Sequence, residues 1–125
     1  QKIDISGKIY LMELDLQSLE AAKLPVYHEL SRYPSVRRDL AIVVDSNQEA
    51  GVIEERIKQE AGELLKEMLI FDVYQGQNIQ KTKKSLALGL TFQHPSRTLT
   101  DEEINSIIDN CIKVLEAQFN AELRM

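Results

Sequence analysis

Two stretches of the chain, residues 69–75 and 84–93, alternate between large apolar side chains and smaller or polar ones. This period of two predicts β-strands with one buried face. The predicted buried faces hold Leu69, Phe71 and Val73 in the first stretch and Leu86, Leu88, Leu90 and Phe92 in the second. The opposite faces hold Ile70, Asp72 and Tyr74 in the first stretch and Ser85, Ala87, Gly89 and Thr91 in the second. The exposed surface therefore combines a carboxylate, an aromatic ring and a hydroxyl with two very small residues, which leaves room for a flat ligand such as a nucleobase.

Two further segments are predicted to be strands. Residues 38–45 alternate, and their shared apolar face consists of Leu40, Ile42 and Val44. Residues 121–124 can close the chain as a short last strand. A loop at residues 76–83 joins the two strands described above.

The N-terminal region is predicted to contain one strand, a short helical turn and an irregular linker. Residues 7–16 are predicted to form a strand, and residues 17–22 a short helical turn. Residues 24–35 contain two prolines and show no clear period, which indicates an extended linker.

The first of two predicted helices covers residues 48–61. Before it, Asp45, Ser46 and Asn47 offer side chains that can accept hydrogen bonds from the free N–H groups of a helix start. Gly62 suits the C-terminal end of this helix. The predicted apolar stripe consists of Val52, Ile53, Ile57 and Ala61.

The second predicted helix has the strongest periodicity in the chain. Thr100 and Glu103 match a T-x-x-E capping box at its start. Apolar residues then recur at helical spacing, and they are Ile104, Ile107, Ile108, Cys111, Ile112 and Leu115. Cys111 is therefore expected in the core.

From residue 38 onward the predicted order is β-α-β-β-α-β, which favours an α+β fold of the ferredoxin-like type. We expect a two-layer sandwich in which an antiparallel sheet carries both helices on one face, preceded by the N-terminal strand and linker as an extension. The first and third strands are central neighbours in this topology, so Ala41 should lie near Ala87 and Gly89. The uncovered face of the sheet would also carry Asp39.

Length and composition narrow the class of protein. The 125 residues suit one domain, and a chain that begins with Gln1 is expected to be a fragment of a longer protein. No apolar run approaches the ~18 residues that span a bilayer, and no signal peptide is visible, so we expect no membrane partner. The single cysteine excludes an internal disulfide and a cysteine-bound zinc, and it favours a reducing compartment.

The formal net charge of −5 disfavours extensive binding to nucleic acid, because phosphate contacts need Lys and Arg. Basic residues nonetheless gather in three places, which are Arg32 with Arg37 and Arg38, Lys81 with Lys83 and Lys84, and Arg97. Such clusters are consistent either with an ordinary solvated surface or with a module that makes few phosphate contacts.

Four runs of sequence are informative together: RYPSVRRDLAIVV at residues 32–44, FDVYQG at 71–76, KSLALGLTF at 84–92 and SRTLTDEEI at 96–104. In order and spacing they resemble the ferredoxin-fold anticodon-binding domain that closes the β subunit of bacterial phenylalanyl-tRNA synthetases. The resemblance covers roughly residues 24–125. It implies that residues 25–125 form this domain and that residues 1–24 are a linker and the tail of a preceding synthetase-like domain.

The resemblance also implies a function: the domain binds the anticodon stem-loop of tRNA(Phe), whose first anticodon base is guanine, and positions the tRNA for aminoacylation. Family members meet this base with residues that correspond to Asp72, Tyr74 and Ser85. A carboxylate matches the two adjacent donors on the guanine edge, and a ring provides a stacking surface. Ala87 and Gly89 are expected to leave that ring unobstructed.

Phosphate contacts are predicted at Arg37, Arg38, Lys83, Lys84 and Arg97. Arg37 and Arg38 could equally form ion pairs with Asp39 or Asp101. Catalytic residues, a metal site and a cofactor are not expected in this chain. By resemblance, the parent is a cytoplasmic phenylalanine–tRNA ligase that uses ATP and magnesium in a separate α subunit of a heterotetramer, with no DNA partner.

Other interpretations compete with this one. A ferredoxin-like regulatory or protein-interaction module without RNA specificity would use an exposed surface at Met68 and Ile70. In that case Asp72 would be a solvated carboxylate, and Tyr74 would cover a hydrophobic rim with those two residues. An acylphosphatase-like hydrolase is rejected because the carboxylate of Asp45, at the end of the strand predicted at residues 38–45, occupies the place where a phosphate would have to bind. His28 and His94 have no second histidine at metal-ligand spacing and are expected in surface or capping roles.

Overall fold

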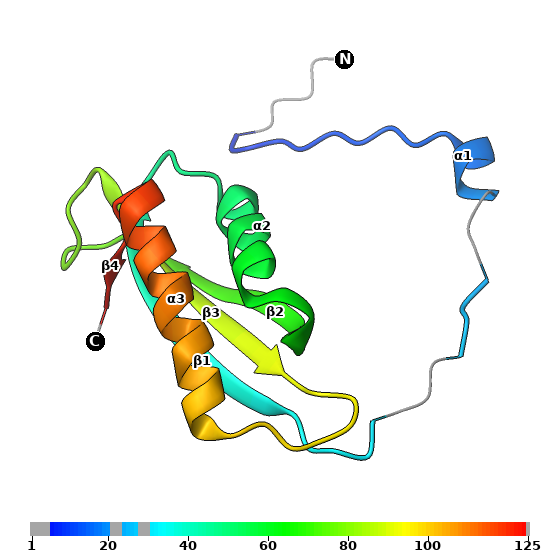
Figure 1. The fold of residues 1–125 in the computed structure, drawn as a ribbon. Helices are drawn as coiled ribbons and strands as arrows, with labels where there is room; N and C mark the ends of the chain where they lie inside the picture. Colours follow the sequence, from blue (N-terminus) through cyan, green and yellow to red (C-terminus); the bar gives the residue numbers. More distant parts are fainter. Residues whose placement is uncertain (1–5, 21–23, 28–30, 125) are drawn as a thin grey trace.

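From residue 36 onward the chain follows the predicted β-α-β-β-α-β order. The computed structural model describes residues 6–20, 24–27 and 31–124. Its elements are α1 (Leu16–Glu20), β1 (Val36–Asp45), α2 (Ala50–Ala61), a 3-10 turn (Gly62–Leu64), β2 (Leu65–Tyr74), β3 (Lys83–Phe92), α3 (Asp101–Phe119) and β4 (Glu122–Leu123). Helices α2 and α3 lie side by side over one face of the sheet (Figure 1). The predicted ferredoxin-like α+β sandwich is confirmed.

The sheet has the strand order β2-β3-β1-β4, and every pairing is antiparallel. β1 and β3 are therefore the central neighbours, as predicted, and Ala41 pairs with Ala87. The core lies between the helices and the side of the sheet that carries Leu86, Leu88, Leu90 and Phe92, all of which are fully buried. No helix of the described residues covers the other side of the sheet, which is called the open face below.

Helix α2 begins later than the sequence predicts. Its N-cap is Glu49, which makes no side-chain capping bond. The predicted caps Asp45, Ser46 and Asn47 are wrong because residues 45–48 form a turn instead: the N–H of Gln48 donates to Asp45 O, and the N–H of Ser46 donates to Thr82 O. Residues 45–48 are thereby held in a non-helical conformation, and the helix begins only at Ala50.

The other predictions for α2 are mostly confirmed. Ile53, Ile57 and Ala61 are buried, whereas Val52 is 44% exposed and does not belong to the stripe. Gly62 ends the helix with a φ of 63°, and its N–H donates to Lys58 O. A positive φ costs glycine little, so the chain can turn sharply into the 3-10 turn and β2.

Helix α3 has the predicted capping box. The Thr100 hydroxyl accepts from the N–H of Glu103 at 3.3 Å, and the N–H of Thr100 donates to Glu103 Oε2 at 2.9 Å. The guanidinium of Arg97 also bonds both oxygens of Glu103, and together these bonds lower the pKa of Glu103 to about 2. Such a carboxylate stabilises the fold above its ordinary pKa, and this contribution is lost as the pH falls towards the lower value.

The far end of α3 directs the chain back to the sheet. Ile104, Cys111 and Leu115 are buried, and burial raises the pKa of the Cys111 thiol to about 11, as expected for a core cysteine. Asn120 ends the helix in the left-handed region with a φ of 48°. β4 then pairs with β1, which confirms the predicted last strand in a shorter form.

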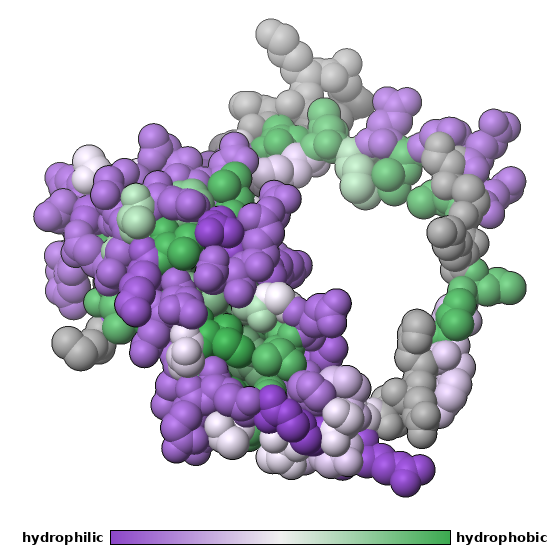
Figure 2. All heavy atoms as spheres, viewed as in Figure 1, coloured by the Kyte–Doolittle hydropathy of each residue, from purple (hydrophilic) through white to green (hydrophobic). Residues whose placement is uncertain are grey.

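The predicted N-terminal strand is wrong. Residues 6–15 form no strand with any described part of the chain, and β-structure needs such a partner for its N–H and C=O groups. Its apolar side chains are exposed, and they are Ile9, Tyr10, Leu11, Met12 and Leu14 (Figure 2). α1 agrees with the predicted helical turn, the described parts of residues 24–35 are irregular as predicted, and His28 lies outside the described residues.

The capping box provides a test of what starts α3. Thr100→Ala removes the hydroxyl that accepts from Glu103, so the free energy of unfolding in urea should fall by about 1 kcal/mol. Thr82→Ala is the control, because Thr82 is exposed in the β2–β3 loop and its side chain makes no hydrogen bond with the described residues. Equal stability of the two variants would contradict a stabilising role for the box.

Candidate functional site

A β-bulge in β2 decides which side chains reach the open face. Ile70 pairs with Leu88, but the next pair is Asp72 with Ala87, so Phe71 is an extra residue in β2. Paired residues of neighbouring strands point to the same face of a sheet. Asp72 and Tyr74 therefore share the open face with Ala87 and Ser85. Without the extra residue, Asp72 would lie opposite Leu86 and point towards the helices.

The bulge makes the predicted faces of residues 69–71 wrong. Met68 and Ile70 are partly buried against the core, while Leu69 lies on the open face opposite Gly89 and is 52% exposed. The interaction surface predicted at Met68 and Ile70 is therefore wrong, and so is the hydrophobic rim that these two would form with Tyr74. For residues 72–74 the predicted alternation of faces is confirmed, because Val73 pairs with the core residue Leu86, but the predicted burial of Val73 is wrong, since it is 57% exposed.

The Tyr74 ring is held from two sides. A Cβ atom added to Gly76 would overlap the Tyr74 hydroxyl oxygen, so the ring occupies the space that a side chain at position 76 would need. The guanidinium carbon of Arg124 lies 5.6 Å from the ring centroid, as in a cation–π contact. Tyr74 is still 39% exposed, so a ligand can reach the ring.

Asp72 and the alanine pair form the middle of the open face. Asp72 is exposed, and its carboxylate has no hydrogen bond or ion pair with any residue in the described part of the chain. Next to it across the sheet come Ala87 and Ala41, whose methyl groups make a shallow floor. Ser85 pairs with Tyr74 and Val43 and is only 4% exposed, so its hydroxyl is much less accessible than expected.

The other end of the open face is filled by Arg37. The Arg37 Nε donates to Asp39 Oδ1 at 2.9 Å, and the guanidinium carbon lies 5.6 Å from the centre of the Phe71 ring. A Cβ atom at Gly89 would lie 2.7 Å from a terminal nitrogen of Arg37. The expectation that Gly89 leaves free space is therefore wrong, because the guanidinium covers it.

The remaining predicted basic residues do not gather beside Asp72. Arg38 bonds Asp101 at 2.5 Å, and the Lys84 ammonium donates to Gln48 O at 2.6 Å; by register, both side chains are on the helix side of the sheet. Arg97 bonds Glu103 at the start of α3, and Lys83 on the open side bonds Glu122. The alternative of ion pairs for Arg37 and Arg38 is confirmed.

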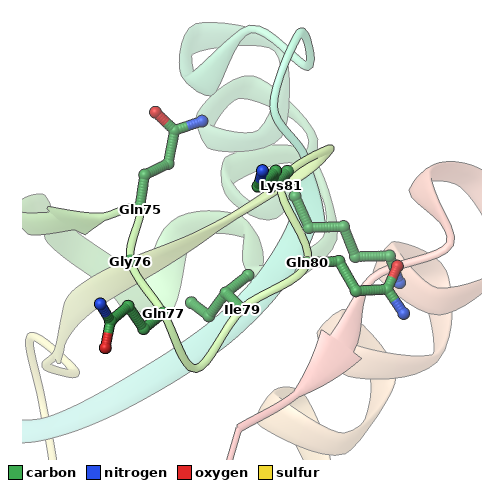
Figure 3. A pocket seen from close by; sticks show the side chains of 7 residues that line it. Gln75, Gly76, Gln77, Ile79, Gln80 and Lys81 are labelled. Atoms are coloured by element: carbon green, nitrogen blue, oxygen red, sulfur yellow. The ribbon is translucent and has the colours of Figure 1, made fainter.

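The β2–β3 loop encloses a concavity next to Tyr74. It has a volume of about 570 Å³ and is lined by Gln75, Gly76, Gln77, Ile79, Gln80, Lys81 and Lys83. Figure 3 shows Ile79 within the loop, while Gln75 and Gln77 point outward from it. The sequence predicts only a connecting loop here, since no spacing in these residues signals a cavity.

Sequence reasoning missed two residues of the site, Gly76 and Arg124. A glycine two residues after the aromatic Tyr74 is a weak signal of close packing. Arg124 has no such signal, because its contact with Tyr74 depends on how β4 pairs. His94 has a local role, as predicted: its Nδ1 accepts from the N–H of Ser96.

The described residues contain neither a cluster of three or more metal-ligating side chains nor a helix long and apolar enough to cross a membrane. What the open face offers is a free carboxylate, an accessible ring and a floor of two methyl groups. Such a surface suits a flat ring with hydrogen-bond donors on its edge.

Comparison with known proteins gives a consistent result. Residues 31–124 match the family described as ferredoxin-fold anticodon binding domain. The phenylalanine–tRNA ligase beta subunit of Coxiella burnetii is 48% identical over 124 residues, and that of Pseudomonas fluorescens strain Pf-5 is 46% identical over 124 residues. The alignments cover 98% and 99% of this chain but 16% of each relative. The chain therefore spans a small part of these relatives' length.

The contact between Tyr74 and Gly76 can be tested directly. Gly76→Ala should displace the Tyr74 ring and change its aromatic NMR shifts, because the new methyl group would overlap the ring. Gly51→Ala is the matched control, since nothing lies within 4 Å of a Cβ at position 51 in α2. Unchanged Tyr74 shifts in Gly76→Ala would show that the ring is not held against this loop.

Proposed function

This chain belongs to the ferredoxin-fold anticodon-binding domain family, and we propose that it binds the anticodon stem-loop of tRNA(Phe) as part of a phenylalanine–tRNA ligase beta subunit. The observation that carries the proposal is the bulge at Phe71, which brings Asp72 and Tyr74 to the same open face. Bulges often redirect side chains in this way beside functional sites.

Asp72 has the chemistry to read a guanine. The Watson–Crick edge of guanine presents two neighbouring donors, N1–H and the exocyclic amine, and a carboxylate has two acceptor oxygens at matching spacing. Bases in RNA loops are commonly recognised through this edge. The carboxylate of Asp72 has no competing partner among the described residues, so the protein need not break an internal bond to use it.

Tyr74 supplies the stacking surface for the same base. Stacking of a base on an aromatic side chain contributes on the order of 1–3 kcal/mol. Gly76 and the alanine pair support this role because they keep the ring in place and leave the floor beside it low. We assign Ser85 a contact with the same nucleotide, which requires its covering neighbours to shift.

Phosphates contribute little in this proposal. Arg37, Arg38, Lys83 and Arg97 all have carboxylate partners, and Lys84 is bonded to a backbone oxygen. A phosphate would have to compete with these partners. Lys81 in the β2–β3 loop has no partner among the described residues, so it is a better-placed phosphate contact.

The role of the longer protein is part of the same proposal. The chain acts as a non-catalytic module without its own cofactor or metal, and it positions tRNA(Phe) for aminoacylation. Phenylalanine is joined to tRNA in the α subunit of a cytoplasmic heterotetramer, with ATP and magnesium bound there.

A protein-interaction module is the second candidate. The edge strand β2 exposes Leu69, Phe71 and Val73 at 52%, 49% and 57%, and exposed edge strands can pair with other chains. Such a module would not distinguish one anticodon base from another, so RNA discrimination separates the two candidates.

The base-reading role of Asp72 predicts a loss of discrimination. Asp72→Ala should weaken binding of the matched stem-loop by about 10- to 100-fold, as for a lost pair of hydrogen bonds to a charged group. A stem-loop with adenine as its first anticodon base should lose little, because adenine lacks the N1–H donor. Fluorescence anisotropy with both RNAs measures this.

Asp109→Ala is the matched control for Asp72→Ala, because it removes the same charge from the exposed side of α3. It should leave both affinities unchanged. If Asp72→Ala lowered the affinity for both RNAs equally, Asp72 would not recognise the first anticodon base, and the loss would be a general effect of its charge.

The internal ion pairs predict a weak salt dependence. With one or two phosphate contacts, the slope of log affinity against log salt should be about −1 to −2 for the matched stem-loop between 50 and 200 mM. A titration series at several salt concentrations gives the slope. A slope of about −4 or steeper would show that the ion pairs open to bind phosphates.

A further inference from the structure

We propose that Arg124 contacts the same base as Tyr74, so that the base is clamped between the guanidinium plane and the ring. This inference rests on the proposed function, since it takes the ligand to be an unstacked RNA base. It adds a specific second surface to the site, contributed by the last residue that the structure describes.

The backbone places Arg124 on the open face. In the pairing of β4 with β1, Leu123 lies opposite Ile42, which points to the core, and Glu122 lies opposite Val43 on the open face. The next residue therefore returns to the open face. Its position is fixed by a hydrogen bond from the N–H of Arg124 to Ala41 O at 2.8 Å.

Arg124 and Tyr74 reach each other across the sheet. They come from strands at opposite edges in the order β2-β3-β1-β4, about 14 Å apart at ~4.8 Å per strand spacing. Two long side chains can meet only by extending over the strands between them, where the open face carries Val43 and the shorter residues Ser85, Ala87 and Ala41. The small residues of the floor therefore leave space for the contact between Arg124 and Tyr74, and they leave space for a ligand as well.

The Arg124 guanidinium is free to move. Its contact is the Tyr74 ring, at 5.6 Å, and it has no hydrogen bond or ion pair with any other residue that the structure describes. Arg37 is different, because its guanidinium lies equally far from the Phe71 ring but is also bonded to Asp39. Of these two arginine–aromatic pairs, only the one at Tyr74 can open without breaking an ion pair.

A base fits between the two groups after a small movement. Each stacking contact needs about 3.5 Å, so a base between ring and guanidinium needs a separation of about 7 Å. The present 5.6 Å must increase by only about 1 to 2 Å. Aromatic rings and guanidinium planes both stack on unpaired RNA bases, so the two surfaces are suited to the same ligand.

The test compares Arg124→Lys and Arg124→Ala on two RNAs. One is the matched anticodon stem-loop, and the other has an abasic first anticodon nucleotide. Both variants should bind the matched stem-loop about tenfold more weakly, because lysine keeps the charge but not the plane. On the abasic RNA, each variant should stay within about twofold of the unsubstituted chain, because there is no base to clamp.

Two controls accompany this test. Lys113→Ala removes a positive charge from the exposed side of α3 and should change neither affinity. The NMR spectrum of each Arg124 variant should retain the core shifts, because the bond from Arg124 to Ala41 uses the backbone and not the side chain.

Other outcomes would overturn the clamp. Arg124 is a phosphate contact if Arg124→Lys binds normally, while Arg124→Ala loses affinity on both RNAs and reduces the salt slope by about 1. Tighter binding by Arg124→Ala would identify the guanidinium as a lid. If the Arg124 variants bind normally while Tyr74→Ala and Asp72→Ala bind weakly, the clamp is wrong and the proposed function stands. If Tyr74→Ala and Asp72→Ala also bind normally, the proposed function itself is wrong.

Discussion

The site depends on one extra residue in an edge strand. β3 cannot slip, because Leu86, Leu88, Leu90 and Phe92 are fully buried against the helices. If β2 shifted by one residue relative to β3 over its whole length, every side chain of β2 would move to the other face of the sheet. The bulge at Phe71 lets the same strand bury Met68 and Ile70 in its first half and expose Asp72 in its second. The first half of the strand thus contributes to the core, and the second half presents Asp72 on the open face.

The sequence predicted the elements with strong local patterns and missed those that depend on pairing. β3 and α3 were correct because their periodicity is regular and α3 has a capping box. In β2, alternation gave the right faces for residues 72–74 but not for 69–71, since no glycine or proline marks the bulge. The start of α2 was wrong because Ser46 is bonded to Thr82, a contact that local preference cannot show.

The clusters of Lys and Arg in the sequence do not show where positive charge is available in the structure. Arg38 pairs with Asp101, 63 positions away, a partner that the sequence offered only as one of two equal alternatives. Exposed ion pairs of this kind contribute little to stability. Their main effect here is to fix the direction of a guanidinium group. The positive charge available to any ligand is therefore smaller than the number of Lys and Arg residues suggests, because most cations near the sheet already have a partner.

The open face has an internal asymmetry that limits the size of its ligand. Arg37 closes one end over Gly89 and is held by Asp39, while Arg124 covers the other end without an ion pair among the described residues. Between them lie the alanine pair and Asp72. In the proposed function, a surface bounded in this way has room for one flat ring at the Tyr74 end, because the guanidinium of Arg37 occupies the Phe71 end. The proposal that the site takes a single base thus depends on the placement of two arginines, of which Arg37 is held by an ion pair with Asp39.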